Sequence, residues 1–172
     1  MAARGRFRIC LVCLGNICRS PMAAAVLRRR LLDTGLADVV SVESAGTGSW
    51  HVGGPADPRT LVALRNRGLN GDGHRARQFT RASFAHYDLI LALDRDNLAE
   101  LHLLAPDDAS RDKIQMLRAY DPLALASGDL DVHDPYYGSD DGFARVFDEI
   151  EPALDGLVQA LTRELDNDPR GN

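Results

Sequence analysis

The sequence is poor in lysine, in cysteine and in long apolar runs, and each shortage excludes a class of protein. Lys113 is the only lysine, so the Gly-rich nucleotide-binding motif that ends in Gly-Lys-Ser or Gly-Lys-Thr is absent. No apolar run approaches the roughly 20 residues that a membrane-spanning helix needs. Cys10, Cys13 and Cys18 are the only cysteines, and they do not make a disulfide framework.

Net charge, histidine spacing and chain length exclude further classes of protein and of site. The formal net charge of −5 argues against nucleic acid as the main partner. No other histidine or cysteine lies at metal-ligand spacing from His74, so no metal site is expected. The basic N-terminus is followed by an apolar run of only residues 9–14, too short for a signal peptide. We expect a single domain over residues 1–172, with residues 166–172 as a frayed polar tail.

The most informative stretch joins an apolar strand, residues 7–12, to a helix that begins near Ser20 and Pro21. Cys13 and Arg19 enclose five residues between the two. A loop of this length can turn backbone N–H groups inward around a polyoxygen anion, and the helix N-terminus adds its dipole. Arg19 adds a planar fork of donors for two phosphate oxygens. These surroundings stabilise a thiolate on Cys13, which predicts phosphoryl transfer to that cysteine and then to water.

The residues of this stretch leave two other interpretations open. Cys10 and Cys13 have the C-x-x-C spacing of redox pairs, although Cys10 lies inside the apolar strand rather than at a helix start. The alternative is a buried structural cysteine beside an arginine that caps a helix. The strand–loop–helix context and the Gly15-Asn16 pair favour a phosphate-binding loop over both.

The alternation of strand and helix patterns predicts an α/β fold with a parallel sheet and helices on both faces. Ser20 is expected to cap the first helix, Pro152 to break or kink the last one, and residues 120–134 to form mainly a loop. Loops at the carboxyl ends of the strands should meet at one site. Strands are expected at residues 7–12, 39–43, 88–93 and, at the sheet edge, 114–117, and helices at residues 20–34, 58–67, 80–85, 94–104 and 141–165.

A phosphate ester that is cleaved at a cysteine leaves an alkoxide or phenoxide, which a general acid should protonate. Asp134, followed by a proline and two tyrosines, is the candidate acid, and His133 ranks second. Aspartate before proline is also a common turn signal. Tyr136 and Tyr137 can form an aromatic wall opposite Trp50, the only tryptophan. A bowl with aromatic walls favours phosphotyrosine, which is longer than phosphoserine.

These residues resemble the low-molecular-weight protein tyrosine phosphatases. The resemblance covers nearly the whole chain, from Ile9 through the last helix. Its two main motifs are Cys13-Leu14-Gly15-Asn16-Ile17-Cys18-Arg19-Ser20-Pro21, which resembles the active-site signature of the family, and Asp134-Pro135-Tyr136-Tyr137-Gly138, which resembles its general-acid loop. Weaker matches are Ser44-Ala45-Gly46, Trp50-His51-Val52-Gly53, His74-Arg75-Ala76-Arg77-Gln78 and Asp94-Arg95-Asp96-Asn97.

The resemblance implies a Rossmann-like, four-stranded parallel sheet of the phosphotyrosine phosphatase I type and a hydrolysis that needs no cofactor or metal. It implies that Cys13 attacks phosphorus while Arg19 holds the equatorial oxygens. Asp134 then protonates the leaving oxygen and, as a base, activates water against the phosphocysteine. Phosphotyrosine-containing proteins are the implied substrates and inorganic phosphate is the product. A tyrosine kinase that acts on Tyr136 or Tyr137 is a candidate partner.

The same resemblance assigns the remaining site residues. The implied phosphate-binding loop is Leu14, Gly15, Asn16, Ile17, Cys18, Arg19 and Ser20, supported by a network of Asn16, Ser20, Ser44 and His74, with Asp94 as a carboxylate nearby. Ser20 is also expected to stabilise the Cys13 thiolate. The implied pocket walls are Leu14, Ile17, Trp50, Tyr136 and Tyr137. Cys18 matches a second loop cysteine that can form a reversible disulfide with the nucleophile.

Two alternative functions share part of this pattern. Thiol-dependent arsenate reductases have a C-x5-R loop, but their redox cycle uses further cysteines downstream, and none follows Cys18 here. A phosphate-binding module without turnover would typically have lost the nucleophile or the acid, and Cys13 and Asp134 are both present. A free thiolate fits a reducing cytoplasm, which is the expected location, and the sequence leaves export without a signal peptide open.

Overall fold

The computed structural model describes residues 6–167, and its sheet is built around strand β1 (Phe7–Cys13). β1 pairs in parallel with β2 (Val40–Gly46) on one side and with β3 (Leu89–Ala92) on the other. β4 (Ile114–Met116) pairs in parallel with β3, which gives the strand order β2-β1-β3-β4. The predicted four-stranded parallel sheet, with its last strand at an edge, is therefore confirmed.

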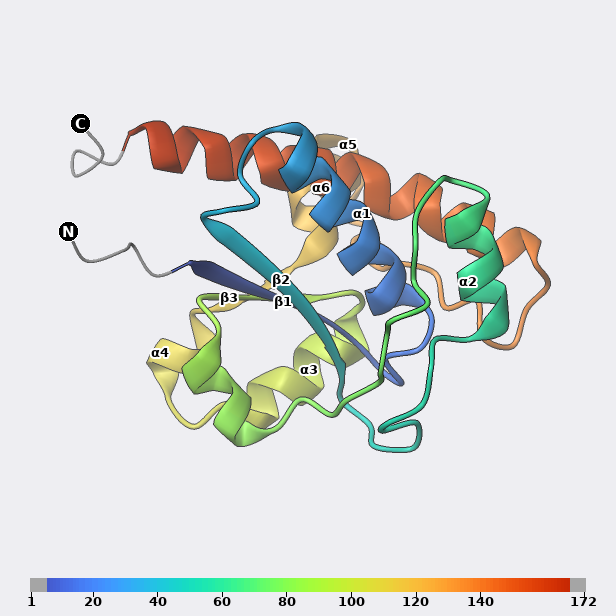
Figure 1. Cartoon of the computed structure of the whole chain (residues 1–172). Helices are drawn as coiled ribbons and strands as arrows, with labels where there is room; N and C mark the ends of the chain where they lie inside the picture. Colours follow the sequence, from blue (N-terminus) through green and yellow to red (C-terminus); the bar gives the residue numbers. More distant parts are fainter. Residues whose placement is uncertain (1–5, 168–172) are drawn as a thin grey trace.

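Helices cover both faces of this sheet (Figure 1). One face carries α1 (Arg19–Asp33) and α6 (Asp141–Asp166), with α2 (Pro58–Arg65) packed against both of them. The other face carries α3 (Arg95–Leu104), α4 (Asp108–Arg111) and the 3-10 helix η1 (Arg81–His86). A second 3-10 helix, η2 (Leu117–Tyr120), leads from β4 into α5 (Pro122–Ser127) and packs against α6.

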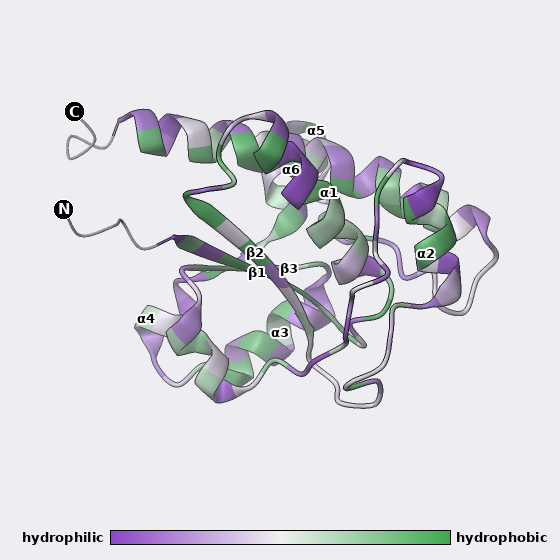
Figure 2. Ribbon diagram, viewed as in Figure 1, coloured by the Kyte–Doolittle hydropathy of each residue, from purple (hydrophilic) through white to green (hydrophobic). Residues whose placement is uncertain are grey.

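The alternation of side chains along β1 divides the core into two layers, because successive residues of a strand point to opposite faces. Ile9, Leu11 and Cys13 join the layer under α1 and α6, whereas Cys10 and Val12 join the layer under α3. Figure 2 shows hydrophobic and hydrophilic residues alternating along the turns of α6. Burial raises the pKa of the Cys10 thiol to about 12. Since Cys10 and Cys13 point to opposite faces of the sheet, the arrangement argues against a C-x-x-C redox pair.

Most of the expected elements are present with ends that differ by a few residues, but the description of residues 120–134 as mainly loop is wrong in part. Residues 122–127 form α5, because the side chain of Asp121 accepts the N–H of Leu123 and Gly128 ends the helix with a φ of 77°. The helix α4 was also not expected. The predicted frayed tail lies outside the described residues from residue 168 onward.

A break at Pro152, one of the two expected outcomes, is wrong as well, because α6 continues without interruption from Asp141 to Asp166; a kink there stays a prediction. A proline inside a helix costs about 3 kcal/mol. The inner face of α6 buries a row of mostly large side chains, and each large one contributes roughly 1.5–3 kcal/mol, so packing, mainly against α1 and η2, outweighs the lost hydrogen bond. The buried side chains are Phe143, Val146, Phe147, Ile150, Ala153, Leu154, Leu157, Val158 and Leu161.

The strand β2 continues to Gly46, three residues past the expected end at Glu43, because it pairs with β1 as far as Cys13. At Gly46 a Cβ atom would lie 2.6 Å from the carbonyl oxygen of Leu14. Only glycine therefore lets β2 approach the loop that follows β1. The carboxyl ends of β1, β2 and β3 bring Cys13, Gly46 and Asp94 to the same edge of the sheet (Figure 1). Among the described residues, none of the helices has the length and apolar composition that a bilayer crossing requires.

Candidate active site

The loop between β1 and α1, residues 14–18, is organised by the fully buried side chain of Asn16. Asn16 has a φ of 57°, in the left-handed region that non-glycine residues seldom adopt. Its Nδ2 donates to the hydroxyls of Ser20 and Ser44 at 2.9 Å each. Its Oδ1 accepts the backbone N–H of Arg77 at 3.0 Å. These three bonds offset a backbone strain of about 1–3 kcal/mol.

His74 holds the loop from behind. Its Nε2 lies 2.6 Å from the carbonyl oxygen of Asn16. Because a carbonyl only accepts, His74 is the donor and carries a hydrogen on Nε2. Burial lowers the pKa of His74, the bond to Asn16 opposes this, and the charges of Arg28, Arg77 and Arg75 lower it further. His74 is therefore a neutral donor at pH 7.

The carbonyls of Leu14 and Ile17 are engaged on the outer side of the loop. The carbonyl of Ile17 accepts the N–H of Asp57 at 2.9 Å and the hydroxyl of Thr60 at 3.1 Å. The carbonyl of Leu14 accepts the N–H of Gly48 at 2.9 Å. In the part of the chain that the structure describes, no protein group accepts the N–H groups of residues 14–18. A run of such donors around one point forms an anion-binding nest.

Cys13 lies at the base of this nest, with 3% of its surface exposed. Its Sγ is 2.9 Å from the hydroxyl of Ser20. Since that hydroxyl accepts from Asn16, its own hydrogen can point to the sulfur of Cys13, which is closer than the carbonyl of Ala45 at 3.5 Å. Ser20 thus provides a hydrogen bond for the sulfur. The expectation that Ser20 caps α1 is wrong, because Cys18 is the N-cap residue and no side chain caps the helix.

Arg19 is fixed beside the nest and is almost fully buried, with 3% of its surface exposed. Its Nη1 donates to Asp94 at 2.6 Å and to the carbonyl of Val132 at 3.0 Å, and its Nη2 lies 3.5 Å from Asp134. Burial lowers the pKa of Arg19, but the sulfur of Cys13 and the carboxylate of Asp94 outweigh it, so the pKa is raised above its ordinary value. Asp94 is itself held, because it caps α3 by accepting the N–H of Asn97 at 2.7 Å.

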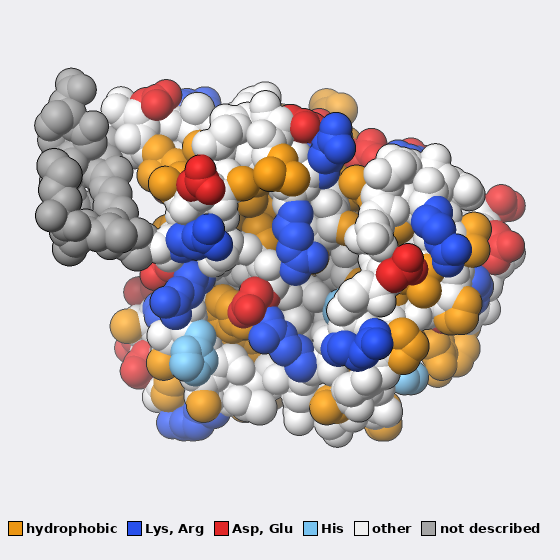
Figure 3. All heavy atoms as spheres, viewed as in Figure 1, with side chains coloured by type: hydrophobic (Ala, Val, Ile, Leu, Met, Phe, Trp, Pro, Cys, Tyr) orange, Lys and Arg blue, Asp and Glu red, His pale blue; other side chains and the backbone are white. Residues whose placement is uncertain are grey.

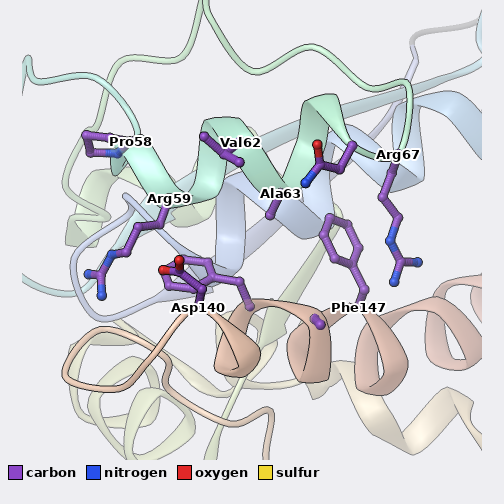
Figure 4. A pocket seen from close by; sticks show the side chains of 10 residues that line it. Pro58, Arg59, Val62, Ala63, Arg67, Asp140 and Phe147 are labelled. Atoms are coloured by element: carbon purple, nitrogen blue, oxygen red, sulfur yellow. The ribbon is translucent and has the colours of Figure 1, made fainter.

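The segment that carries Asp134 is anchored by Arg59 of α2. Arg59 donates to the carbonyls of Tyr136 at 2.9 Å and Gly138 at 3.3 Å. The carboxylate of Asp57 orients Arg59 through contacts at 3.0 and 2.9 Å, and these hydrogen bonds lower the pKa of Asp57. Figure 4 shows Arg59 at one end of a groove of about 380 Å³ between α2 and α6.

The side chains around Cys13 enclose a cavity of about 410 Å³. Its outer parts are aromatic: Tyr136 meets Tyr137 edge to face at 4.8 Å, and Trp50 is 72% exposed. Ser44 and His74 lie behind the loop, and Asp94 lies behind Arg19. The lining residues are Cys13, Leu14, Gly15, Ile17, Cys18, Arg19, Trp50, His51, Asp134, Tyr136 and Tyr137.

Sequence reasoning missed several residues of this site. His51 lines the cavity and lies 6.2 Å from the ring of Tyr136. Arg77 and the Asp57–Arg59 pair support the two loops from outside. His51 and Arg77 had a signal, since both lie in segments that weakly match the family. Burial, and next the charge of Asp57, raise the pKa of the Cys18 thiol to about 12, so this second cysteine of the cavity is a neutral thiol.

A family model described as low molecular weight phosphotyrosine protein phosphatase matches residues 8–167. The chain belongs to this family. A low molecular weight protein-tyrosine-phosphatase of Streptomyces coelicolor is 49% identical over 160 residues, which are 93% of this chain and 96% of the relative. The low molecular weight protein-tyrosine phosphatase A of Mycobacterium tuberculosis is 46% identical over 157 residues, 91% of this chain and 93% of the relative.

Solved structures agree with this assignment. A protein tyrosine phosphatase of Entamoeba histolytica, crystallised with Hepes in its active site, superposes with a TM-score of 0.86 at 35% identity. The match covers 92% of this chain and 98% of that structure. The four-stranded sheet and its flanking helices are therefore the fold of the family.

The role of Asn16 can be tested with two substitutions that separate backbone strain from hydrogen bonding. Asn16→Gly removes the strain and the three bonds, and leaves buried polar groups unpaired at roughly 1–3 kcal/mol each. Asn16→Ala also keeps an unfavourable left-handed backbone, which costs about 1 kcal/mol more. We expect urea unfolding to rank stability as wild type, then glycine, then alanine.

The matched control for these variants is Asn66→Ala at the exposed C-cap of α2, which should change stability by about 0.5 kcal/mol or less. If Asn16→Gly is as stable as the wild type, the network around Asn16 does not hold the loop.

Proposed function

We propose that this protein hydrolyses phosphotyrosine in proteins through a phosphocysteine intermediate on Cys13. The observation that carries the proposal is the nest of free N–H groups of residues 14–18, with the sulfur of Cys13 at its base and Arg19 beside it. A phosphate dianion offers the oxygens that these donors need. No metal is required to bind or to activate it there.

In the first step the thiolate of Cys13 attacks phosphorus, and the bond from phosphorus to the tyrosine oxygen breaks. The N–H groups of the nest and the guanidinium of Arg19 bind the equatorial oxygens as charge shifts in the transition state. The hydroxyl of Ser20, 2.9 Å from the sulfur, stabilises the thiolate before attack. The rigid hold of Asp94 and Val132 on Arg19 keeps its donors in place, so no reorganisation is needed.

Asp134 is the proposed general acid. Its Oδ2 lies 3.5 Å from Arg19, its Oδ1 accepts the N–H of Tyr136, and its side chain is 44% exposed at the mouth of the cavity. From this position it gives a proton to the departing tyrosine oxygen. As a carboxylate it then takes a proton from the water that attacks the phosphocysteine, which releases inorganic phosphate and regenerates the thiolate of Cys13.

The shape of the cavity supports an aromatic substrate. Leu14, Ile17, Trp50, Tyr136 and Tyr137 surround the path from the surface to Cys13. A phenyl ring can pack against these side chains while its phosphate reaches the nest, whereas the side chain of phosphoserine is shorter and has no ring to pack. We also propose Tyr136 and Tyr137 as targets of a tyrosine kinase. Tyr137, which is 95% exposed, is the more accessible of the two.

Cys18 is the proposed redox partner of Cys13. Peroxide would oxidise the thiolate of Cys13 to a sulfenic acid, and the thiol of Cys18 would then displace water to form a disulfide. We expect mass spectrometry after peroxide treatment to find Cys13 linked to Cys18, and Cys18→Ala to drive Cys13 to the sulfinic acid. Finding sulfinic Cys13 without a disulfide in the wild type would contradict this role.

We also propose that the protein is located in the cytoplasm, because a reducing compartment keeps the thiolate of Cys13 free.

The covalent step is tested by Cys13→Ser. We expect the rate of phosphotyrosine hydrolysis to fall by about 10⁴-fold or more, as it does when other enzymes lose their nucleophile. Phosphate binding, measured by ³¹P NMR, should persist, because the nest and Arg19 remain. Cys10→Ala, on the other face of β1, is the control and should keep activity. Turnover that survives in Cys13→Ser would refute the phosphocysteine.

The acid is tested by Asp134→Asn with two substrates that differ in leaving group. With phenyl phosphate we expect kcat/KM to fall by about 10²–10⁴-fold, because the phenoxide then leaves unprotonated. With 4-nitrophenyl phosphate, whose leaving group is stable as an anion, the loss should be much smaller. The ratio kcat/KM is the right measure because it reports only the steps up to the phosphocysteine.

Asp129→Asn is the control for this experiment, since Asp129 is exposed and does not line the cavity that contains Cys13. Equal losses of kcat/KM with both substrates would show that Asp134 is not the general acid.

A further inference from the structure

A separate cleft of about 330 Å³ lies on the far side of the phosphate-binding loop from the Cys13 cavity. We call it the arginine cleft. α1, the end of β2 and the segment 70–77 enclose it, and Figure 3 shows basic side chains around a hollow on this face. Its lining residues are Pro21, Ala25, Arg28, Glu43, Ser44, Asn70, Gly71, Gly73, His74, Arg75 and Arg77.

The arginine cleft carries an excess of positive charge on a protein whose net charge is −5. Three guanidinium groups line it against one carboxylate, that of Glu43, which pairs with Arg77 at 2.8 Å. Neither Arg28 nor Arg75 forms an ion pair within residues 6–167. Among the described residues, Arg28 donates only to the carbonyl of Val42, at 2.9 and 3.3 Å. The fork of a guanidinium matches the spacing of phosphate oxygens, and donors stay available on both side chains.

The inner wall of the cleft is formed by groups that hold the phosphate-binding loop. His74 donates to the carbonyl of Asn16 at 2.6 Å, and the backbone N–H of Arg77 binds the side chain of Asn16. The guanidinium of Arg77 also donates to the carbonyl of Ser44 at 3.0 Å. A ligand in the arginine cleft would therefore touch residues that are hydrogen-bonded to the phosphate-binding loop, without entering the Cys13 cavity.

We propose that the arginine cleft is a second anion site, which binds an inorganic chain of two or three phosphoryl groups between Arg28 and Arg75. The cleft volume of about 330 Å³ and the two guanidinium groups in its lining favour a ligand with more than one phosphoryl group. The lining residues include no phenylalanine, tyrosine or tryptophan on which a nucleotide base could stack, which favours the inorganic chain over a nucleotide.

Binding in the cleft has a consequence for His74. The charged and titratable groups that face His74 are Arg28 of α1, Glu43 of β2 and Arg75 and Arg77 of its own segment. An anion there offsets the three guanidinium charges that disfavour the imidazolium, so the midpoint of His74 protonation rises. Protonated His74 makes a charge-assisted bond to Asn16, so occupancy of the cleft tightens the loop.

The experiment uses inorganic tripolyphosphate as the probe and the His74 imidazole as the reporter, followed by NMR across a pH titration. Cys13 is first alkylated with iodoacetate, so that the probe cannot enter the catalytic cavity and the result does not depend on turnover. We expect tripolyphosphate to raise the midpoint of His74 protonation in a saturable manner. The variant R28A/R75A should bind about tenfold more weakly or worse, since each arginine supplies charge-assisted bonds.

The matched control is R65A/R81A, which removes the same charge from exposed positions outside the cleft and should bind like the wild type. Arg75→Ala alone serves as a second variant. Its exposed side chain donates, within the described part of the chain, only to the adjacent carbonyl of His74, so its loss should not affect folding. It should weaken binding severalfold. Absence of any His74 shift, or equal weakening in R28A/R75A and R65A/R81A, would overturn the proposal.

Discussion

The site depends on one constraint: a loop that points its N–H groups at an anion must find partners outside itself for its carbonyls. The carbonyls of Leu14, Asn16 and Ile17 meet this constraint, because the loop after β2, the His74 segment and the start of α2 supply donors. The side chain of Asn16 fixes the turn at its centre in a left-handed conformation. Each unmade bond here would cost about 1–3 kcal/mol, so the shape is built into the fold and does not need the ligand to form it.

The same rigidity extends to Arg19. A buried guanidinium is stable only when it is paired, and removing one partner of such a pair costs about 3–5 kcal/mol. Asp94 and the carbonyl of Val132 take the donors of Nη1, while Nη2 faces Asp134 at 3.5 Å. Asp94 neutralises part of the charge that would attract phosphate, so it weakens electrostatic attraction. In return the donors of Arg19 are held in one direction, and this favours a transition state of fixed geometry over tight binding of the ground state.

Local patterns in the sequence were sufficient for the presence and order of the strands and for the loop between β1 and α1. They failed where tertiary contacts decide. Ser20 is of a residue type that often caps helices and lies where α1 was expected to begin, yet its hydroxyl binds the sulfur of Cys13. The extent of β2 is set by its pairing with β1, and the continuity of α6 through Pro152 by its buried face. His51 and Arg59 both contact Tyr136, which lies more than 70 residues further along the chain, and no local sequence pattern can predict such contacts.

The beginning of α2 explains how two loops from opposite ends of the chain form one site. The backbone N–H of Asp57 binds the carbonyl of Ile17, while its carboxylate holds Arg59. Arg59 in turn donates to the carbonyls of Tyr136 and Gly138. A single residue, Asp57, thus links the phosphate-binding loop to the segment of Asp134 through bonds that it makes with different atoms. The proton transfer that we propose requires an acid within hydrogen-bond reach. This link sets the position of Asp134 relative to Cys13, and the sequence motifs alone cannot set it.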